Sequence, residues 1–581
     1  MAKIAIKEYI QGQTTLFPQS LDERIPENAP VRVVNYVVDR LDLTEVMSTY
    51  KGGGCSCYSP RMLLKVLFFA YMNNIYSCRK IEALMEWDVR YMWLSGDQHP
   101  DFRTVNRFRS EHLKETIDGL FSQVVVLLVE EGFVSLREQY VDGTKIESKS
   151  NKYRFVWRKS VEKSKAKLER KIKAVLAEIE KGIAGDNAAD DDNSTPMDSR
   201  RLKERIDELN KARREKWSKE EKRMMKELEE KMLTKLQEYE EHLEIMGDRN
   251  SYSKTDHDAT FQHMKEDAMG NGQLKPGYNL QIGTENQFVT NYALYPNPTD
   301  TLTLPSFLDH GKELTGTYPE ACTADAGYGS EANYDFLEAN SITPYVKYNY
   351  FHKEQKKAFR EDPFRQENLH YNEEGDYLVC PSGQHMRRVG ERLDTDPYGN
   401  RHTITTYRAS NCNSCPLHAR CFKGRGDREI EVNHNLRRHK AHAREMLTSE
   451  DGLLRRSRRP IEPEAVFGQM KYDKQYKRFR HTGKAKVHMD LGVFFIAFNL
   501  QKMIRRMLRN IGNALSRLYR SLLGTLWTIT LSFLTDSCRR LTIPVTVEQL
   551  PWLYKKKEGA FWDTLTTNPP QPQIRHRKER D

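Results

Sequence analysis

The sequence predicts an α/β protein in which a mixed sheet follows a helical region and is interrupted by two long insertions. Strand-like runs alternate with helix-like segments at about residues 138–148 and 274–347, the pattern of a sheet packed against helices. A long charged section separates these two stretches, and a cysteine-containing section follows them. The predicted parts are a helical region at 1–135, the sheet at 136–500 with insertions at about 155–250 and 350–455, and a C-terminal helical region with a basic tail at 501–581.

Size and charge limit the class of protein. The 581 residues exceed one typical core and suit roughly two to four domains. The chain has 93 Lys and Arg against 82 Asp and Glu, a modest excess that favours a polyanionic partner without proving one. We see no run with the length of a membrane span and no signal-peptide pattern. Nine cysteines without such a pattern indicate a reducing compartment, and we expect a cytoplasmic protein.

The first clear helix signal follows Ser59, which suits an N-cap, with Pro60 at the first helical position. Three further helices are predicted, at Arg79 to Trp87, Phe102 to His112 and Thr116 to Glu131. In the second of these, Arg103, Asn106 and Arg107 fall on one face. Several short helices with a basic member suggest an all-α DNA-binding domain. A solvated charged face explains the same residues equally well.

Three acidic residues far apart in the sequence have related surroundings. Asp142 ends a strand-like run that Gly143 interrupts, and Asp325 ends a second short run. Glu464 follows Pro463, which suits the first turn of a helix. Carboxylates on two strands and a helix are what a two-metal phosphoryl-transfer site requires, because Mg²⁺ prefers hard oxygen ligands.

These surroundings resemble the DDE transposases of bacterial insertion sequences, a family with an RNase H-like catalytic domain. The matching stretches are YVDGTKIES around Asp142, TADAGYGSEANY around Asp325 and EAVFGQMK from Glu464 to Lys471. PRMLLKVLFFAYMNNIYSCRKIE and MWLSGDQHPDFRTVNRFR are similar to the N-terminal region of that family. Each motif alone is weak, but their order and spacing are specific together.

The resemblance implies that Asp142, Asp325 and Glu464 bind two Mg²⁺ or Mn²⁺ ions. The protein would cleave double-stranded DNA at the ends of its element and join the freed 3′-OH to target DNA. Lys471 would hold a phosphate near the cut. We expect a homodimer on DNA, located in the cytoplasm with the nucleoid. Two other classes stay open: a metal-dependent nuclease that cuts without joining, and a non-catalytic DNA-binding protein descended from such an enzyme.

The register of the acidic helix depends on the choice between two glutamates in IEPE. At ~100° per residue, Glu462 would lie about 160° from Glu464, and Pro463 makes Glu462 the residue before the helix. Glu464, Gly468 and Lys471 have the spacing i, i+4, i+7 and are predicted to share one face. We therefore predict that Glu464 is the catalytic acid.

The first insertion, at about 156–246, has two arms with apolar residues at helical spacing and dense opposite charges. Between them lies the acidic stretch AGDNAADDDNSTPMDS, which is unfit for packing. We predict an antiparallel helical hairpin inserted after the first strand. A spacer or dimerisation arm is favoured over direct DNA contact.

The sheet resumes with LKPGYNLQIGTE and FVTNYALYPN, which are predicted to form a hairpin. A helix, the Asp325 strand, a second helix and the strand TPYVKYN follow. This order fits an RNase H-like mixed sheet with the two aspartates at neighbouring strand ends. A doubly wound nucleotide-binding fold would need a glycine-rich phosphate loop after its first strand, and the sequence has none there.

The second insertion contains the strongest cysteine signal. Its four cysteines are Cys380, Cys412, Cys415 and Cys421. A C-x₂-C pair with a third cysteine close by can surround zinc tetrahedrally, with Cys380 as the fourth ligand. His385 or His418 could replace one ligand, and reduced, packed thiols are an equally good alternative. Soft sulfur ligands suit a structural zinc site and not a catalytic one.

A basic stretch, KYDKQYKRFRHTGKAK, follows Glu464 and includes Arg478 and Arg480. Tyr472, Tyr476 and Phe479 are interleaved with its cations. Phosphate contacts and base stacking would use these residue types, although plain solvation explains the charges too. The apolar segment VHMDLGVFFIAFNLQKMIRRML is predicted to be a core helix that supports the acidic helix.

Overall fold

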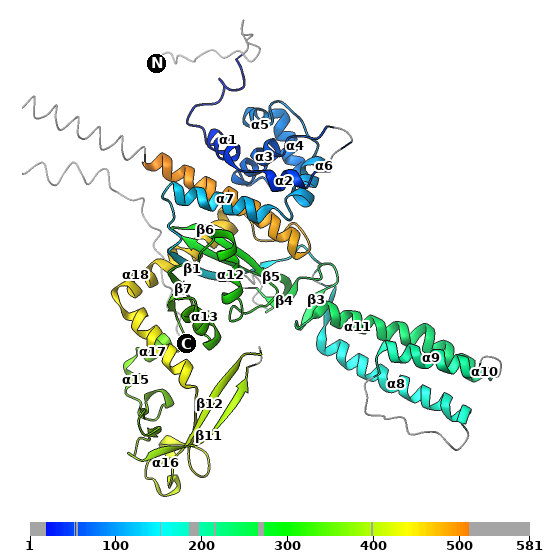
Figure 1. Ribbon diagram of the computed structural model, residues 1–581, viewed down its shortest axis with the longest axis vertical. Helices are drawn as coiled ribbons and strands as arrows, with labels where there is room; N and C mark the ends of the chain where they lie inside the picture. Colours follow the sequence, from blue (N-terminus) through cyan, green and yellow to red (C-terminus); the bar gives the residue numbers. More distant parts are fainter. Residues whose placement is uncertain are drawn as a thin grey trace, which may run out of the picture. The chain divides into compact units, whose positions relative to one another are not determined.

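The computed structural model describes residues 19–510 except 52, 54–55, 152, 185–196, 214–216, 265–271 and 397–398. The chain divides after Ile504 into two units, and the description below concerns the first (Figure 1). The acidic tip of the first insertion and the predicted basic tail lie outside the described residues. Within the described part, no helix is long and apolar enough to cross a membrane.

All regular secondary structure in the described residues before the first strand is helical. They are α1 Pro30–Arg40, α2 Thr44–Ser48, α3 Pro60–Met72, α4 Cys78–Trp87, α5 Val89–Ser95, α6 Phe102–Arg107, the π-helical turn η1 Phe108–His112 and α7 Ile117–Glu130. The predictions for α3, α4, α6 with η1, and α7 are confirmed, whereas α1, α2 and α5 were not predicted. The helix α5 had a readable signal: Asp88 accepts a hydrogen bond from Arg90 N, and Gly96 ends the helix in the left-handed conformation.

A last helix runs through residues 484–510, and its part up to Ile504 ties these helices to the rest of the first unit. Both this helix and α3 are apolar around most of their circumference, which requires burial on all sides. The buried Asp490 carboxylate accepts hydrogen bonds from Tyr71 of α3 and from Tyr476, the latter at 2.5 Å. Arg109 lies 3.7 Å from the same carboxylate. The predicted core role of this helix is confirmed by its burial.

The central sheet is mixed and has the strand order β4-β5-β1-β7-β8, with β6 paired to β5. Its strands are β1 Glu138–Glu147, β4 Thr260–His263, β5 Leu274–Glu285, β6 Phe288–Tyr295, β7 Ala321–Ala324 and β8 Thr343–Val346. The strand β1 runs antiparallel to β5 and parallel to β7. The predicted β5–β6 hairpin is confirmed, and its turn residues Asn286 and Gln287 both have positive φ, as tight hairpin turns require.

The predicted end of the first strand at Asp142 is wrong, because β1 continues to Glu147. Gly143 does not break the strand; it pairs with Gln281 of β5. A Cβ at Gly143 would lie closer than 3.0 Å to Gln281 Nε2 and Asp300 Oδ1. The glycine therefore permits a close approach of the buried Gln281 and the half-buried Asp300, which is the other common reason for glycine within a strand.

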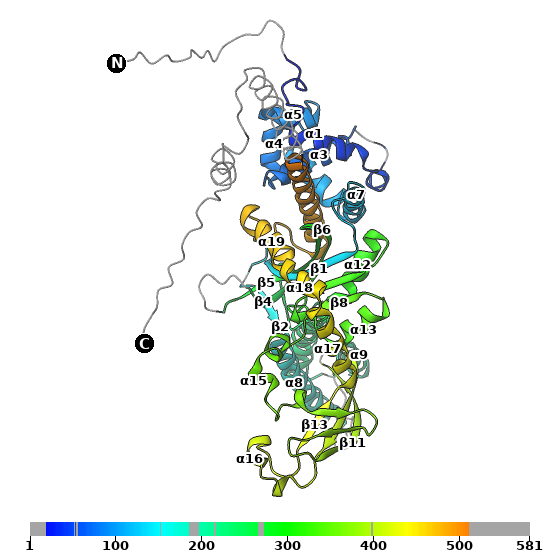
Figure 2. The same cartoon turned by 90° about the vertical axis from the view of Figure 1, so that its left-hand side faces the viewer.

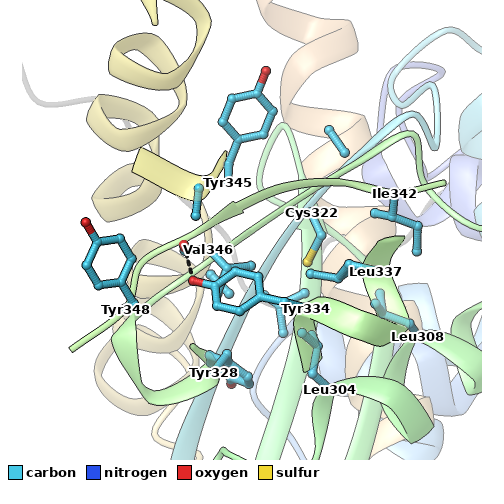
Figure 3. Packing of buried hydrophobic residues seen from close by; sticks show 14 of the residues in the cluster. Leu304, Leu308, Cys322, Tyr328, Tyr334, Leu337, Ile342, Tyr345, Val346 and Tyr348 are labelled. Carbon is cyan, nitrogen blue, oxygen red and sulfur yellow. Dashed lines mark hydrogen bonds between the residues drawn. The ribbon is translucent and has the colours of Figure 1, made fainter. Parts of the chain in front are cut away.

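A hydrophobic cluster covers one face of the sheet (Figure 3). It joins α12 Leu304–Thr315, α13 Glu331–Ala339 and α17 His434–Thr448 to β7 and β8. Tyr334 donates a hydrogen bond to the carbonyl of Val346 at 2.9 Å, so its buried hydroxyl is satisfied. After α17, the helices α18 Glu450–Arg458 and α19 Pro463–Gly468 return the chain to β1 (Figure 2).

The first insertion is a bundle of three helical segments, so the predicted two-armed hairpin needs correction. The helix α8 Arg158–Ala184 packs on α11 Thr234–Met246, and α9 Ser199–Arg213 packs on the π-helical turn η2 Leu228–Leu233 (Figure 1). The second arm is divided because a new helix, α10 Lys219–Glu227, starts at a capping box of Ser218 and Glu221. The S-x-x-E spacing is a sequence signal for that start. Short strands β2 Phe155–Trp157 and β3 Ser251–Ser253 pair at the base.

The second insertion has a five-stranded sheet of its own, in the order β13-β12-β11-β10-β9. Its strands are β9 His370–Asn372, β10 Tyr377–Val379, β11 His385–Thr395, β12 Arg401–Arg408 and β13 Glu429–Val432. Its core is small and consists of Leu369, Leu378, Met386, Tyr407, Ala409, Ile430 and Val432. Most side chains of β11 are exposed, so the sheet buries little apolar surface.

The close approach at Gly143 makes a testable prediction. Gly143→Ala should lower the free energy of unfolding by about 1–3 kcal/mol, because the methyl group must displace the side chains of the buried Gln281 and the half-buried Asp300. Gly390→Ala is the matched control, since nothing lies within 4 Å of a Cβ at this strand position. Urea denaturation of the full chain measures both, and a Gly143→Ala protein as stable as the control would contradict the packing described.

Candidate functional site

The parallel pairing of β1 with β7 places two of the predicted acids side by side. Tyr140 pairs with Thr323, and Asp142 and Asp325 each follow two residues later. The Asp142 side chain is largely buried, whereas that of Asp325 is 39% exposed. Asp325 also accepts a hydrogen bond from Gly327 N at 2.8 Å, which fixes the turn that follows β7.

The third predicted acid reaches the same place from α19. Glu464 lies in the first turn of this helix, after Pro463 at its first position, as predicted. One guanidinium joins all three carboxylates: Arg459 Nη2 lies 3.3 Å from Asp142 Oδ1 and 3.5 Å from Asp325 Oδ2, and Nη1 lies 3.0 Å from Glu464 Oε1. The structure therefore brings Asp142, Asp325 and Glu464 into one cluster.

The cluster carries more negative than positive charge, since three carboxylates surround one guanidinium. Arg459 is itself mostly buried, with 12% of its side chain exposed. Like charges held this close repel one another unless cations lie among them. A site of this composition attracts divalent cations, and carboxylate oxygens are the ligands that Mg²⁺ and Mn²⁺ prefer.

A fourth carboxylate, Asp300, belongs to the same site and was missed from the sequence. Its Oδ1 accepts hydrogen bonds from Asn279 Nδ2 at 2.7 Å and Gln281 Nε2 at 2.6 Å. A Cβ on Gly143 or on Gly327 would come within 4 Å of the Asp300 side chain, so Asp300 lies beside the residues next to both aspartates. Its only sequence signal is a turn, PNPTD, between a strand and a helix, and many turns contain an Asp for local reasons.

Lys347 and Tyr328 complete the surroundings of the cluster. Burial lowers the pKa of Lys347, and the nearby Arg459 lowers it further, while Asp325 and Glu464 act in the opposite direction. Burial raises the pKa of Tyr328 well above its ordinary value. The Tyr328 hydroxyl therefore stays protonated and donates a hydrogen bond to Gln281.

Glu462 lies outside the cluster and has a different environment. It is the residue before α19, as predicted, and is buried. Its carboxylate accepts a hydrogen bond from Gln287 N at 2.6 Å and from Thr284 Oγ1 at 3.3 Å. Glu462 thus fixes the tip of the β5–β6 hairpin to the start of α19.

The predicted common face of Glu464 and Lys471 assumed a regular α-helix, and this assumption is wrong. The α-helix ends at Gly468, and Lys471 lies in the π-helical turn η7 Gln469–Asp473. A π-helical turn closes i→i+5 hydrogen bonds and so has more residues per turn. The calculation from α-helical spacing therefore does not apply to Lys471.

The basic stretch after Glu464 is only partly a surface. Tyr476 and Phe479 are buried, so the interpretation of these two rings as base-stacking groups is wrong. The guanidinium of Arg480 lies 3.8 Å from the ring centre of Tyr76, between that ring and Tyr476. Arg478 donates hydrogen bonds to the carbonyls of Ser148 and Ser150 at 3.0 and 3.2 Å, but half of its side chain is exposed.

The predicted DNA-facing side of α6 is accessible. Arg103, Asn106 and Arg107 are exposed. Arg107 lies 3.9 Å from Glu111 one turn later, and Asn106 Oδ1 accepts a hydrogen bond from the buried Arg109 at 3.2 Å. The two exposed arginines keep their charges at the surface, where a partner can reach them.

Two groups of side chains elsewhere have potential ligand atoms within 4.8 Å of one another: Asp118 with His310 and His488, and Asp335 with Glu338 and His439. The three acids around Arg459 are more widely spaced than this. In the first group, His488 Nε2 lies 2.7 Å from Asp118 Oδ1. Although burial acts the other way, hydrogen bonds from His310 and His488 hold the pKa of Asp118 below its ordinary value. These groups have no carboxylate in common with the Arg459 cluster.

A cavity of about 450 Å³ lies near the start of β1 and is lined by Glu138, Arg458 and Glu462 among others, but by none of the three clustered acids. The four cysteines of the second insertion line another cavity, and all of them are free thiols.

Comparison with known proteins adds two matches. A family model described as a transposase DDE domain matches residues 379–504, which include Glu464. A second, described as a transposase domain (DUF772), matches residues 19–111, which include Arg103, Asn106 and Arg107. No curated protein and no solved structure matches the chain. The two matches come from different ends of one chain, and together with its cluster of two aspartates and a glutamate they support a DDE-type transposase of an insertion element.

Proposed function

We propose that the protein cuts DNA at the ends of its element and joins the freed 3′-OH to target DNA, with Asp142, Asp325 and Glu464 as metal ligands in an RNase H-like domain. One observation carries the proposal: the three acids converge on a single cation, Arg459. Two Mg²⁺ or Mn²⁺ ions would supply an activated nucleophile and stabilise the leaving oxygen.

The side chains present suit these ions. Asp142 is held within the sheet, while 39% of Asp325 and 48% of Glu464 remain exposed. A rigid ligand on a strand and accessible ligands beside it leave room for water and a DNA phosphate. Asp300, oriented by two side-chain amides, is positioned to support the ligand next to Gly143.

Arg459 has a separate role in this proposal. In the ion-free protein its guanidinium balances the carboxylates, and it has to withdraw when divalent ions bind. A guanidinium next to the reacting phosphate then suits a bidentate phosphate contact. Arg459 would thus keep the acids assembled before the ions arrive and bind DNA afterwards.

Contacts with DNA would come from two regions of the chain. We propose that Arg103, Asn106 and Arg107 on α6 belong to an N-terminal DNA-binding domain, because both arginines are exposed. Lys471 and the half-exposed Arg478 would hold phosphates near the acids, while Arg480 supports their segment through its two tyrosine rings. A homodimer on paired element ends in the cytoplasm, with the nucleoid, completes the proposal.

The competing function is a nuclease that cuts without joining, since the same carboxylates serve both reactions. Labelled DNA with an intact element end and the same DNA with the end already cut, each incubated with supercoiled target and Mg²⁺, separate the two by reporting cleavage and joining respectively. Covalent joining to the target supports transposition, and cleavage without joined product supports the nuclease. A non-catalytic DNA-binding protein would give neither product.

Glu464→Gln should lower the rate of cleavage by orders of magnitude and leave DNA binding intact. The glutamine amide has the size of the glutamate carboxylate but lacks the charge that a divalent ion needs. Glu462→Gln is the paired variant. It should cleave almost normally per folded molecule but unfold at lower temperature, because the buried carboxylate that accepts the Gln287 amide hydrogen loses its charge. Cleavage assays and thermal melts measure both proteins. Loss of cleavage in Glu462→Gln and not in Glu464→Gln would show that the helix register is wrong.

Arg459→Gln should bind Mn²⁺ about tenfold more tightly in the absence of DNA, because a competing cation is removed. The same variant should melt at lower temperature in EDTA, since the three carboxylates then repel one another without compensation. Arg458→Gln, an exposed neighbour without these contacts, is the control and should change neither quantity. Free Mn²⁺ measured by paramagnetic resonance gives the affinities, and unchanged Mn²⁺ binding by Arg459→Gln would reject its role as counter-cation.

DNA affinity should fall steeply with salt, because lysine and arginine contacts release counterions from DNA. Arg107→Gln should lower the slope of log affinity against log salt by about one. Lys219→Gln, an exposed change on the helical bundle, should leave the slope unaltered. Fluorescence anisotropy with element-end DNA measures these slopes, and affinity that is constant between low and moderate salt would contradict the proposed contacts.

A further inference from the structure

We infer that the second insertion binds one zinc ion between Cys380, Cys412, Cys415 and Cys421. Cys380 follows β10, and the other three lie in the segment between β12 and β13. All four line one cavity of about 20 Å³, which has room for about one water-sized sphere. Two segments more than thirty residues apart in sequence thus bring four cysteines to the wall of one small cavity.

The sulfur atoms accept hydrogen bonds, as ligands held by a surrounding shell do. Gln384 N donates to Cys380 Sγ at 3.3 Å, and Arg428 N donates to Cys412 Sγ at 3.4 Å. The Arg428 guanidinium donates to Cys421 Sγ at 3.0 Å. Such outer contacts orient metal ligands, and the arginine offsets part of the negative charge that four thiolates would bring to the site.

The turn after Cys380 fixes the position of the Gln384 amide next to the Cys380 sulfur. In CPSGQ, the amide of Cys380 donates to the carbonyl of Gln384 at 2.9 Å, and Gly383 donates to the carbonyl of Cys380 at 2.9 Å. Gly383 has a φ of +84°, a conformation that favours glycine. The tight turn places the Gln384 amide against the sulfur, so backbone geometry and ligand orientation are set together.

Regular secondary structure gives the surrounding segment little support. The segment from Ala409 to Arg428 contains only a 3₁₀ turn, Cys412–Ser414, and a four-residue helix, His418–Cys421. The core of this sheet is small, and scaffolds with so little buried apolar surface commonly depend on a metal or disulfides. The described cysteines form no disulfide, which leaves a metal as the cross-link between the two segments.

The donor set selects the ion. Four thiolates with a C-x₂-C pair are typical ligands of tetrahedral zinc at about 2.3 Å, and a closed site of this type is structural. His418 also lines the cavity, and its Nε2 is buried without a hydrogen-bond partner.

The test uses the full chain purified under reducing conditions. Elemental analysis should find about one zinc per chain, and the cobalt-substituted protein should show the near-ultraviolet absorption of thiolate-to-cobalt charge transfer. Cys412→Ser and Cys421→Ser should each lower zinc content about tenfold. Cys57→Ser, an exposed cysteine outside the cavity, and Glu464→Gln should both keep the zinc, which separates this site from the acidic cluster.

Three results would overturn the inference. The first is freshly purified wild-type protein without zinc and without a cobalt charge-transfer band, a measurement that does not depend on the folding of any variant. The second is zinc that survives Cys412→Ser but is lost in His310→Gln, which would assign the metal to the Asp118 group. The third is iron and sulfide in the protein, which would make the four cysteines a cluster site.

Discussion

The buried carboxylate of Asp490 is the interaction on which the first unit depends. It accepts hydrogen bonds from Tyr71 and Tyr476 and lies close to Arg109, so it joins the N-terminal helices, the last helix and the segment after α19. Burial alone would raise the pKa of Asp490, but Arg109, His481 and the tyrosine hydroxyls outweigh it and hold that pKa below its ordinary value. A buried charge with this many partners is stable only when all are present. The position of α19, and with it Glu464, is therefore tied to residues near the start of the chain.

The acidic cluster differs from Asp490, because its carboxylates repel one another and so lower the stability of the fold. Asp142, Asp325 and Glu464 are held near one another by a strand, a turn and a helix, and Arg459 is the cation among them. The strain of assembling like charges is concentrated where divalent ions would remove it. Asn279 and Gln281 limit that cost by hydrogen bonding to Asp300 at the side of the site, so the polar groups next to the acids are satisfied without adding positive charge.

Much of the sheet and the acidic cluster could be predicted because their signals are local: alternating strands, the β5–β6 turn, and Pro463 before Glu464. Arg459 could not, because its contacts depend on the angle between α18 and α19 and on a 3₁₀ turn between them. Tyr476 was misread since tyrosine suits both a core and a nucleic-acid surface. The division of the long charged arm was visible in the capping box at Ser218 but was overridden by its continuous helical periodicity. The DNA contacts stay predictions.

The distance along the chain between Tyr71 and Asp490 also governs when the protein can fold. The two residues are 419 positions apart, and at about 5 to 20 residues per second a ribosome needs roughly 20 to 85 s to synthesise that length. Until then the Tyr71 hydroxyl of α3 lacks the carboxylate that accepts its hydrogen bond, and Arg109 lacks the carboxylate that lies beside its charge. A chain that ends early cannot complete the core of its own N-terminal helices. The fold thereby makes the N-terminal helices and the acidic cluster dependent on each other, since both reach their final structure only on chains synthesised past Asp490.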